Sequence, residues 1–166
     1  MKKYSEKIDL ATNILTIIVA ILFIGIFAQK YFFSSSKTSS KTPTIGKQIS
    51  IENFDFSTNK KNVFIVMMKG CRFCEASMAF YKKLIQQNQN NNIKIIAVFP
   101  PESPEIETYL KKYGIIGFEI KYLHPSSLET EATPTIIVTD ETGKIIKYWI
   151  GSLSEEKEME VTTFLN

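Results

Sequence analysis

Hydrophobic residues follow two different patterns along this chain. Residues 10–28 run without a single charged side chain. A helix of that length would extend about 28 Å, which matches the hydrocarbon core of a bilayer, so this stretch predicts a transmembrane helix. From residue 46 onward the apolar residues instead form short runs and helical repeats separated by polar turns, which predicts one folded domain.

Within residues 46–166 the pattern predicts an α/β domain. Short apolar runs bounded by turn residues predict strands over 48–54, 63–68, 93–99, 118–123, 135–139 and 144–149. Apolar residues at helical spacing predict helices over 73–87, 104–113 and 154–165, the second with Ser103 as its N-cap. Because helices alternate with the first strands and a hairpin comes last, we expect a sandwich with a central mixed sheet flanked by helices.

Polarity divides the remainder of the chain into three parts. Residues 1–9 form a short lysine-bearing tail, 10–29 the transmembrane signal anchor, and 30–45 a tether rich in Ser, Thr and Lys. The apolar run is long and its exit, Ile26–Gln29, is a poor cleavage site, so we expect the anchor to stay uncleaved. The sequence therefore predicts a single-pass membrane protein.

The side of the membrane is a separate question, because lysines flank the span at both ends. A short basic end, then a span, then a long domain is the layout of a signal anchor, which leaves the tail in the cytoplasm and exports the domain. Disulfides also persist outside the cytoplasm. We expect the domain to lie on the extracytoplasmic face of the cell membrane.

Charge argues against nucleic acid as a partner. The formal net charge is +3, yet residues 34–166 hold sixteen Lys and Arg against fifteen Asp and Glu. The folded part is thus nearly neutral, whereas a nucleic-acid surface needs basic residues clustered on one face.

Candidate chemistry concentrates at Cys71 and Cys74, the two cysteines of the sequence. They lie between a predicted buried strand and a predicted helix. The positive end of a helix dipole favours a thiolate over a thiol, and Arg72 adds a positive charge beside both sulfurs. We predict that Cys71 is the attacking nucleophile, that Arg72 lowers its pKa, and that the more buried Cys74 is the resolving thiol.

The cysteine pair could instead bind zinc or form a structural disulfide. Structural zinc takes four Cys or His ligands, and His124 is the one histidine available to help, so no metal site is expected. A structural disulfide closing so short a loop would restrict the unfolded chain very little. Redox chemistry, which needs no bound cofactor, is the better prediction.

Three further motifs accompany the C-x-x-C pair. Ala132–Thr135 precedes an apolar strand, Asp140–Gly143 forms a D-x-x-G turn, and Trp149–Gly151 ends the hairpin. Together these motifs resemble the thioredoxin superfamily, in particular its membrane-anchored redoxins of the TlpA and ResA type, over residues 45–165. The resemblance implies a cis proline at Pro134 facing the dithiol, and it implies that Thr133 and Pro134 bind an extended substrate peptide.

The sequence departs from that family at the positions expected to move protons. Ile65 stands where thioredoxin has a buried acid beneath the dithiol, and Ser77 stands where the ResA branch has a glutamate. Glu75 is close in sequence but should point to another side of the helix. The group that assists Cys74 is left open, with Glu75 or water as candidates.

Three functions from different classes are consistent with a reactive dithiol. We rank first a thiol:disulfide oxidoreductase acting on protein or peptide thiols and disulfides, with a DsbD-like membrane protein as a possible electron donor. A peroxiredoxin-like thiol peroxidase is second, but Phe64 and Met68 occupy the Pro and Thr positions of its motif. A copper chaperone resembling the Sco proteins is third, because those proteins use a C-x-x-x-C spacing.

Overall fold

The structure is a computed structural model that describes residues 14–23, 41–88, 92–117 and 119–166. The chain divides into two units, Met1–Ser39 and Ser40–Asn166. In the first unit, residues 14–23 are helical, and the rest of the predicted transmembrane segment lies outside the described residues. Within the described ranges, no helix combines the length and the apolar character needed to cross a membrane.

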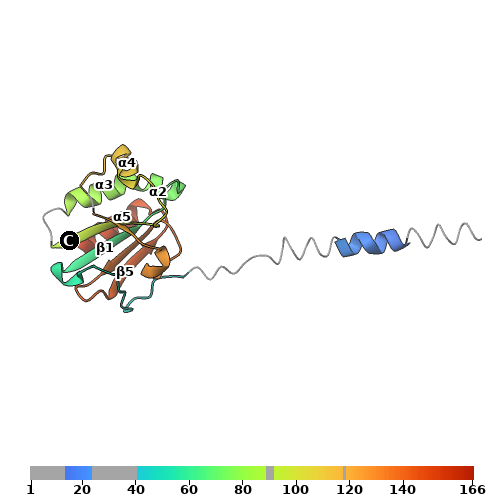
Figure 1. The fold of residues 1–166 in the computed structure, drawn as a ribbon, viewed down its shortest axis with the longest axis horizontal. Coiled ribbons are helices and arrows are strands. Elements are labelled where there is room, and N and C mark those ends of the chain that lie inside the picture. Colours follow the sequence, from blue (N-terminus) through green and yellow to red (C-terminus); the bar gives the residue numbers. More distant parts are fainter. Residues whose placement is uncertain (1–13, 24–40, 89–91, 118) are drawn as a thin grey trace, which may run out of the picture. The chain divides into compact units, whose positions relative to one another are not determined.

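The second unit is built on a mixed sheet of five strands (Figure 1). The strands are β1 (Lys61–Val66), β2 (Ile93–Phe99), β3 (Glu119–Tyr122), β4 (Thr135–Thr139) and β5 (Ile145–Ile150), in the order β3-β2-β1-β4-β5. Strands β1, β2 and β3 run parallel, while β4 is antiparallel to both β1 and β5. The expected mixed sheet, with parallel strands first and a hairpin last, is confirmed.

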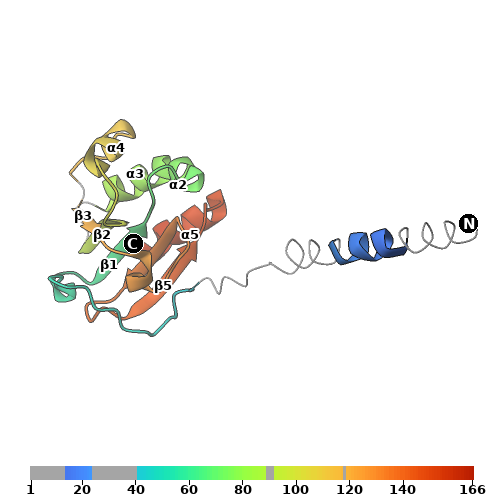
Figure 2. The same ribbon diagram turned by 45° about the vertical axis from the view of Figure 1, so that its right-hand side comes forward.

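The four α-helices among the described residues of this unit pack on one face of the sheet (Figure 2). They are α2 (Arg72–Ala76), α3 (Met78–Gln87), α4 (Ile106–Lys112) and α5 (Glu155–Leu165). The connections β1 to β2 and β2 to β3 step in the same direction across the sheet. Because such crossovers are right-handed, α3 and α4 fall on the same side. The opposite face is covered by residues 49–56 and two 3-10 turns, η2 (Phe56–Thr58) and η3 (Pro125–Leu128).

The central strand β1 shows how the sequence specifies both cores. Its side chains alternate between the faces of the sheet, so Val63 and Ile65 join the helix-side core while Phe64 and Val66 join the other. All four side chains are fully buried. The continuous apolar run in the sequence follows from this position between two packed faces.

One predicted strand is wrong. Residues 48–54 contribute an isolated bridge from Gln48 to Lys144 and then turn, with Asn53 at a φ of 55°. Ile49 and Ile51 are buried, as the alternating pattern implies, but they pack on the sheet face opposite the helices. Burial of alternate residues therefore does not require that the segment pair as a strand.

Two predicted helices differ from expectation: the first is broken into two, and the second begins later in the sequence. The helix predicted over 73–87 is broken at Ser77, whose hydroxyl donates to the Phe73 carbonyl at 3.0 Å, a contact that tends to bend helices. Phe73, which the helical spacing of apolar residues would place on the buried face, is 60% exposed. The next helix begins at Ile106, with Glu105 rather than Ser103 at the N-cap, and the Ser103 amide instead closes a turn onto Pro100.

Candidate active site

Cys71 lies directly after the central strand, at the N-terminus of α2. Gly70 makes the turn possible, because its φ of +78° is a conformation that other residues rarely adopt. Cys71 is the N-cap of α2, and its Sγ accepts a hydrogen bond from the Cys74 amide at 3.2 Å. The predicted placement of this sulfur against the free amides of a helix is therefore confirmed.

The topology of the sheet places Thr133 and Pro134 beside Cys71. Strand β4 is antiparallel to β1, with Val66 opposite Thr135, so the start of β4 lies beside the end of β1. The Thr133–Pro134 peptide bond is cis, as the resemblance implied. The Sγ atom of Cys71 lies 3.7 Å from the Thr133 carbonyl oxygen and 3.7 Å from its Oγ1. Their role in binding a substrate peptide stays a prediction.

The surroundings of Cys71 favour its thiolate form. Partial burial opposes ionisation and is the largest single influence, but four hydrogen bonds together outweigh it and lower the pKa of Cys71. The donors are the thiol and amide of Cys74, the side chain of Thr133 and the amide of Phe73. Each stabilises the charged sulfur more than the neutral one.

Cys74 has the opposite environment. It is fully buried within the helix-side core, and this burial raises the pKa of its thiol to about 12. Its hydrogen bond to the Cys71 sulfur contributes to this raised pKa, since a thiol that donates a bond holds its proton more tightly. The two thiols therefore have unequal environments, and their roles as attacking and resolving thiol stay a prediction.

Arg72 and Glu75 both point toward solvent from the same turn of helix. The hydrogen bonds to Cys71 account for its lowered pKa, so the tuning role of Arg72 stays a prediction. Among the residues with described positions, no group of three or more Cys, His, Asp or Glu could hold a metal ion.

Exposed apolar side chains flank the dithiol. Met68, whose carbonyl accepts a bond from the Cys71 amide, is 47% exposed, and Phe73 lies two residues beyond Cys71. On the other side, Ile150 is 40% exposed and opposite Thr135, next to the cis proline. The sulfur of Cys71 is thus set in an apolar surface.

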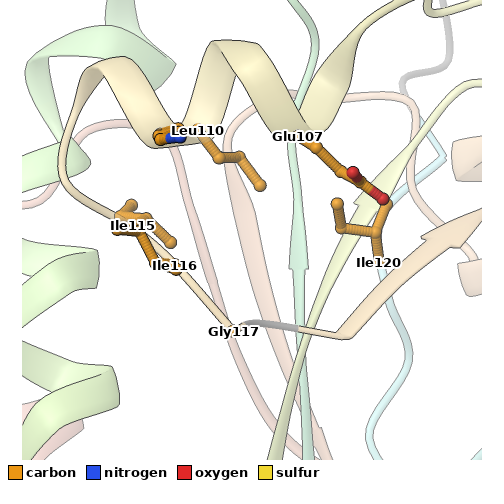
Figure 3. Close-up of a pocket in the computed structure, with 7 residues that line it drawn as sticks. Glu107, Leu110, Ile115, Ile116, Gly117 and Ile120 are labelled. Atoms are coloured by element: carbon orange, nitrogen blue, oxygen red, sulfur yellow. The ribbon is translucent and has the colours of Figure 1, made fainter.

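A pocket of about 290 Å³ lies elsewhere, between α4 and the start of β3 (Figure 3). Its lining includes Leu110, Ile115 and Ile120 together with Glu107 and Lys111. None of the dithiol residues takes part in it.

Sequence reasoning missed one polar residue beneath the dithiol. Tyr81 is 2% exposed, and burial raises the pKa of its hydroxyl. The spacing of Cys74, Ser77 and Tyr81, three and then four residues, would place all three on one face of an unbroken helix, which is the signal that could have found it.

No protein-family model matches the sequence, and no curated protein matches it. Several solved structures, however, are similar to this chain. A thiol:disulfide interchange protein from Chlorobium tepidum superposes with a TM-score of 0.58 at 13% identity, over 75% of this chain and 98% of that one. StoA from Bacillus subtilis superposes with a TM-score of 0.54 at 15% identity, over 76% of this chain and 99% of that one. A thiol-disulfide isomerase from Corynebacterium glutamicum superposes with a TM-score of 0.55 at 16% identity, over 76% of this chain and 94% of that one.

Proposed function

We propose that this chain, which has the thioredoxin-like fold, is a membrane-anchored thiol:disulfide oxidoreductase that acts on protein disulfides outside the cytoplasm. One observation carries the proposal. A partly exposed thiol with a lowered pKa sits at a helix N-terminus, 3.7 Å from the residue before a cis proline and hydrogen-bonded to a buried second thiol. Dithiol exchange needs such an unequal pair.

The chemistry proceeds in two exchanges. The Cys71 thiolate attacks one sulfur of a substrate disulfide, so that a Cys71–substrate disulfide forms and the other substrate sulfur leaves as a thiolate that takes up a proton. Cys74 then loses its proton and attacks Cys71, which releases the second substrate thiol and leaves a Cys71–Cys74 disulfide. The substrate gains two electrons and two protons, and the reverse sequence oxidises a dithiol.

The surface around Cys71 favours extended, apolar segments of protein as substrates. Met68, Phe73 and Ile150 offer exposed apolar area on both sides of the sulfur. Between them the backbone of Thr133 borders Cys71, where a strand-like peptide could pair with it. We therefore propose Thr133 and Pro134 as the substrate platform, with a DsbD-like membrane protein as the partner that supplies electrons.

Membrane anchoring is supported by the first unit of the chain. Residues 10–28 carry no charge, and eight large apolar side chains of the 14–23 helix are 44% to 67% exposed. So much exposed apolar surface is unfavourable in water, and lipid would cover it. A thiol pair that must cycle through a disulfide is also suited to the extracytoplasmic compartment.

The two alternative functions gain no support from the geometry. The motif position that a peroxiredoxin gives to proline is occupied by Phe64, which is fully buried in the sheet. His124, the histidine that a copper site would recruit, is largely exposed and lies 4.0 Å from Glu102. A second function is therefore not proposed.

An equilibrium redox titration of the full chain in detergent tests the enzymatic part of the proposal. Alkylation mass shifts should report one two-electron couple between Cys71 and Cys74, and Cys71→Ser should abolish both the couple and the reduction of a disulfide-bonded test protein. A dithiol that forms no reversible disulfide would contradict it.

Anchoring is tested separately in bacterial cells. The full chain should resist alkaline extraction from membranes, and a membrane-impermeant thiol reagent should label Cys71 in intact cells. Deletion of residues 10–28 should release the domain. Protection of Cys71 from the reagent would place the domain on the other side.

A further inference from the structure

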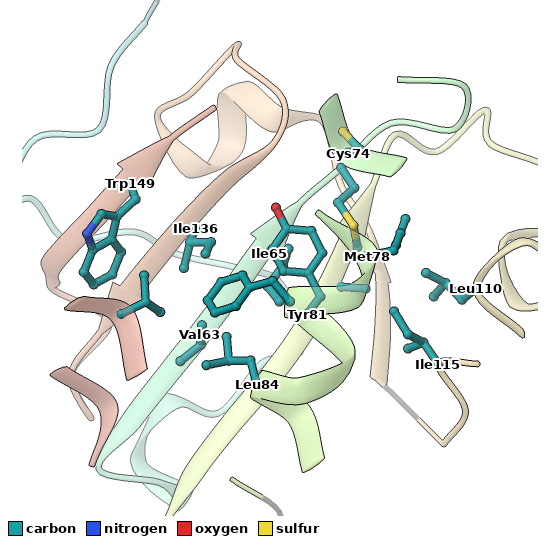
Figure 4. Packing of buried hydrophobic residues seen from close by; sticks show 14 of the residues in the cluster. Val63, Ile65, Cys74, Met78, Tyr81, Leu84, Leu110, Ile115, Ile136 and Trp149 are labelled. Carbon is teal, nitrogen blue, oxygen red and sulfur yellow. The ribbon is translucent and has the colours of Figure 1, made fainter. Parts of the chain in front are cut away.

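Cys71 is bordered by two parts of the chain that are held in place in different ways. On one side Cys74 lies among the buried side chains of the helix-side core (Figure 4). On the other side lies the loop of residues 129–134, whose Thr133 places its carbonyl oxygen and its Oγ1 each 3.7 Å from the Cys71 sulfur. The loop connects η3 to β4 and belongs to neither, so its position depends on contacts other than strand pairing.

Two buried hydroxyl groups brace this loop from within. The Oγ1 of Thr130 accepts a hydrogen bond from the Ala132 amide at 3.2 Å, and the Oγ1 of Thr135 donates to the Ala132 carbonyl at 2.7 Å. The two hydroxyl oxygens lie 3.4 Å apart, and both threonines are fully buried. A displacement at the start of the loop is therefore transmitted to Thr133.

A segment that precedes the first strand contacts the start of the loop. We call residues 41–47 the docked segment. The Lys41 carbonyl accepts a hydrogen bond from the Glu131 amide at 3.3 Å, and Pro43 is buried although the residues on both sides of it are exposed. Near the other end of the segment, the Gly46 amide donates to a carbonyl of β5 at 2.8 Å. The docked segment is thus held at both ends by the folded unit.

Glu129 joins the docked segment to the loop through its side chain. One carboxylate oxygen lies 3.2 Å from the Nζ of Lys41, and the other lies 2.7 Å from the Nζ of Lys47. Lys41 also donates to the Ser126 carbonyl at 3.3 Å. Exposed ion pairs contribute little, but the Glu129 side chain is only 16% exposed. A carboxylate that is shielded from water and bound at both oxygens is held in one place.

We propose that Glu129, by binding both lysines of the docked segment, holds Thr133 and Pro134 where they take up a substrate peptide. Glu129 is a positioning residue, because it acts through the loop and not on the reacting sulfur. The inference rests on the proposed function and deepens it, since it gives the last residues of the predicted tether a part in substrate binding.

The test compares two disulfides that differ in their need for the loop. The full chain in detergent, with dithiothreitol as reductant, is given either a disulfide-bonded peptide, which can pair with the Thr133 backbone, or a small aromatic disulfide, which cannot. Glu129→Gln keeps the size of the side chain and removes its charge. It should raise the KM for the peptide about fivefold with little change in kcat, which is the effect of one typical hydrogen bond. The small disulfide should react at nearly the unmodified rate.

Matched variants separate positioning from a general effect of lost charge. Lys47→Met should raise the KM for the peptide as Glu129→Gln does, and the double variant should add little, because both changes remove the same contact. Lys94 and Glu119 form an ion pair of 2.8 Å at the opposite end of the sheet from the dithiol. Glu119→Gln should therefore leave the KM unchanged.

Amide hydrogen exchange tests the contact without reference to activity. In the unmodified chain the Glu131 amide is bonded to the Lys41 carbonyl and should exchange slowly. In Glu129→Gln the amides of residues 129–133 should exchange faster, while those of β1 keep their protection. Unaltered exchange over residues 129–133 would contradict the role given to Glu129.

Failure of the function and failure of the inference give different results. If the unmodified chain reduces neither disulfide, the proposed oxidoreductase function is wrong, and the part in substrate binding falls with it. If it reduces both and Glu129→Gln leaves the KM for the peptide unchanged, the inference alone is overturned. Equal slowing with both disulfides would also overturn it, because the effect would then lie in the reactivity of Cys71 and not in peptide binding.

Discussion

The two thiols of this protein are three residues apart, yet their surroundings differ in every respect that sets reactivity. Cys71 caps a helix and receives hydrogen bonds from backbone and side chain, which lower its pKa. Cys74, one turn further on, is enclosed by the core, and burial raises its pKa to about 12. The difference arises from position alone, since the residue type is the same.

This comparison explains why the exchange has an order. Of the two sulfurs, that of Cys71 has the lowered pKa and is partly exposed, so under the proposed function the first attack belongs to Cys71. The inner sulfur becomes nucleophilic only when its proton is removed, which delays it until the first bond has formed. The predictions below test this asymmetry, beginning with the largest expected effect.

Serine substitutions should separate the two thiols most clearly. Cys74→Ser should trap a stable Cys71–substrate disulfide, because a serine hydroxyl does not resolve it, while Cys71→Ser should form no adduct and reduce turnover to background. Non-reducing electrophoresis with a disulfide-bonded test protein measures both. An adduct formed through Cys74 in the Cys71→Ser variant would reverse the assigned roles.

The buried thiol should support the outer thiolate as a hydrogen-bond donor. Cys74→Ala removes that donor and should raise the pKa of Cys71 by about one to two units, because a hydrogen bond to a charged group is worth about 1.5–3 kcal/mol. Alkylation of Cys71 at neutral pH should then slow about tenfold or more. Cys74→Ser retains a donor and is the matched control, which should stay close to the unmodified value.

Thr133 should contribute less, because its hydroxyl lies 3.7 Å from the sulfur. Thr133→Val keeps the shape of the side chain and removes the donor, so it should raise the pKa of Cys71 by about half a unit. Thr133→Ser, which keeps the hydroxyl, should not. The pH dependence of alkylation measures the shift, and a fall in pKa would contradict the assigned direction.

Arg72 should have the smallest effect. Its side chain is exposed, so Arg72→Ala should raise the pKa of Cys71 by about 0.3 unit at low salt and by less at high salt, where the charge is screened. Arg72→Lys serves as the control. A shift larger than that of Cys74→Ala would show that charge, and not hydrogen bonding, dominates this site.

The sequence was sufficient for the framework of the site. Residues 63–68, 93–99 and 135–139 are predominantly apolar, and the three strands appear within two residues of those limits. The dithiol turn also followed from the sequence, because a glycine before Cys71 and a helical repeat after it leave few conformations. The cis bond at Pro134 came from family resemblance and not from pattern.

What the sequence did not reveal depends on contacts between distant residues. Ile49 and Ile51 alternate as in a strand, and pattern alone cannot tell strand pairing from packing on a sheet face. From the sequence alone, Tyr81 is not distinguished from the other aromatic residues of the core. Likewise, the hydroxyl oxygens of Ser77 and Ser152 lie 3.4 Å apart although 75 positions separate them in the sequence, and no sequence pattern predicts that contact.

The asymmetry of the two thiols is tested most directly by the pH dependence of alkylation at each cysteine in the reduced full chain, resolved by peptide mass spectrometry. We expect Cys71 to titrate below the ordinary thiol pKa of about 8.5 and Cys74 to stay unreactive until the pH approaches 12. Two cysteines that titrate together near the ordinary value would contradict the account.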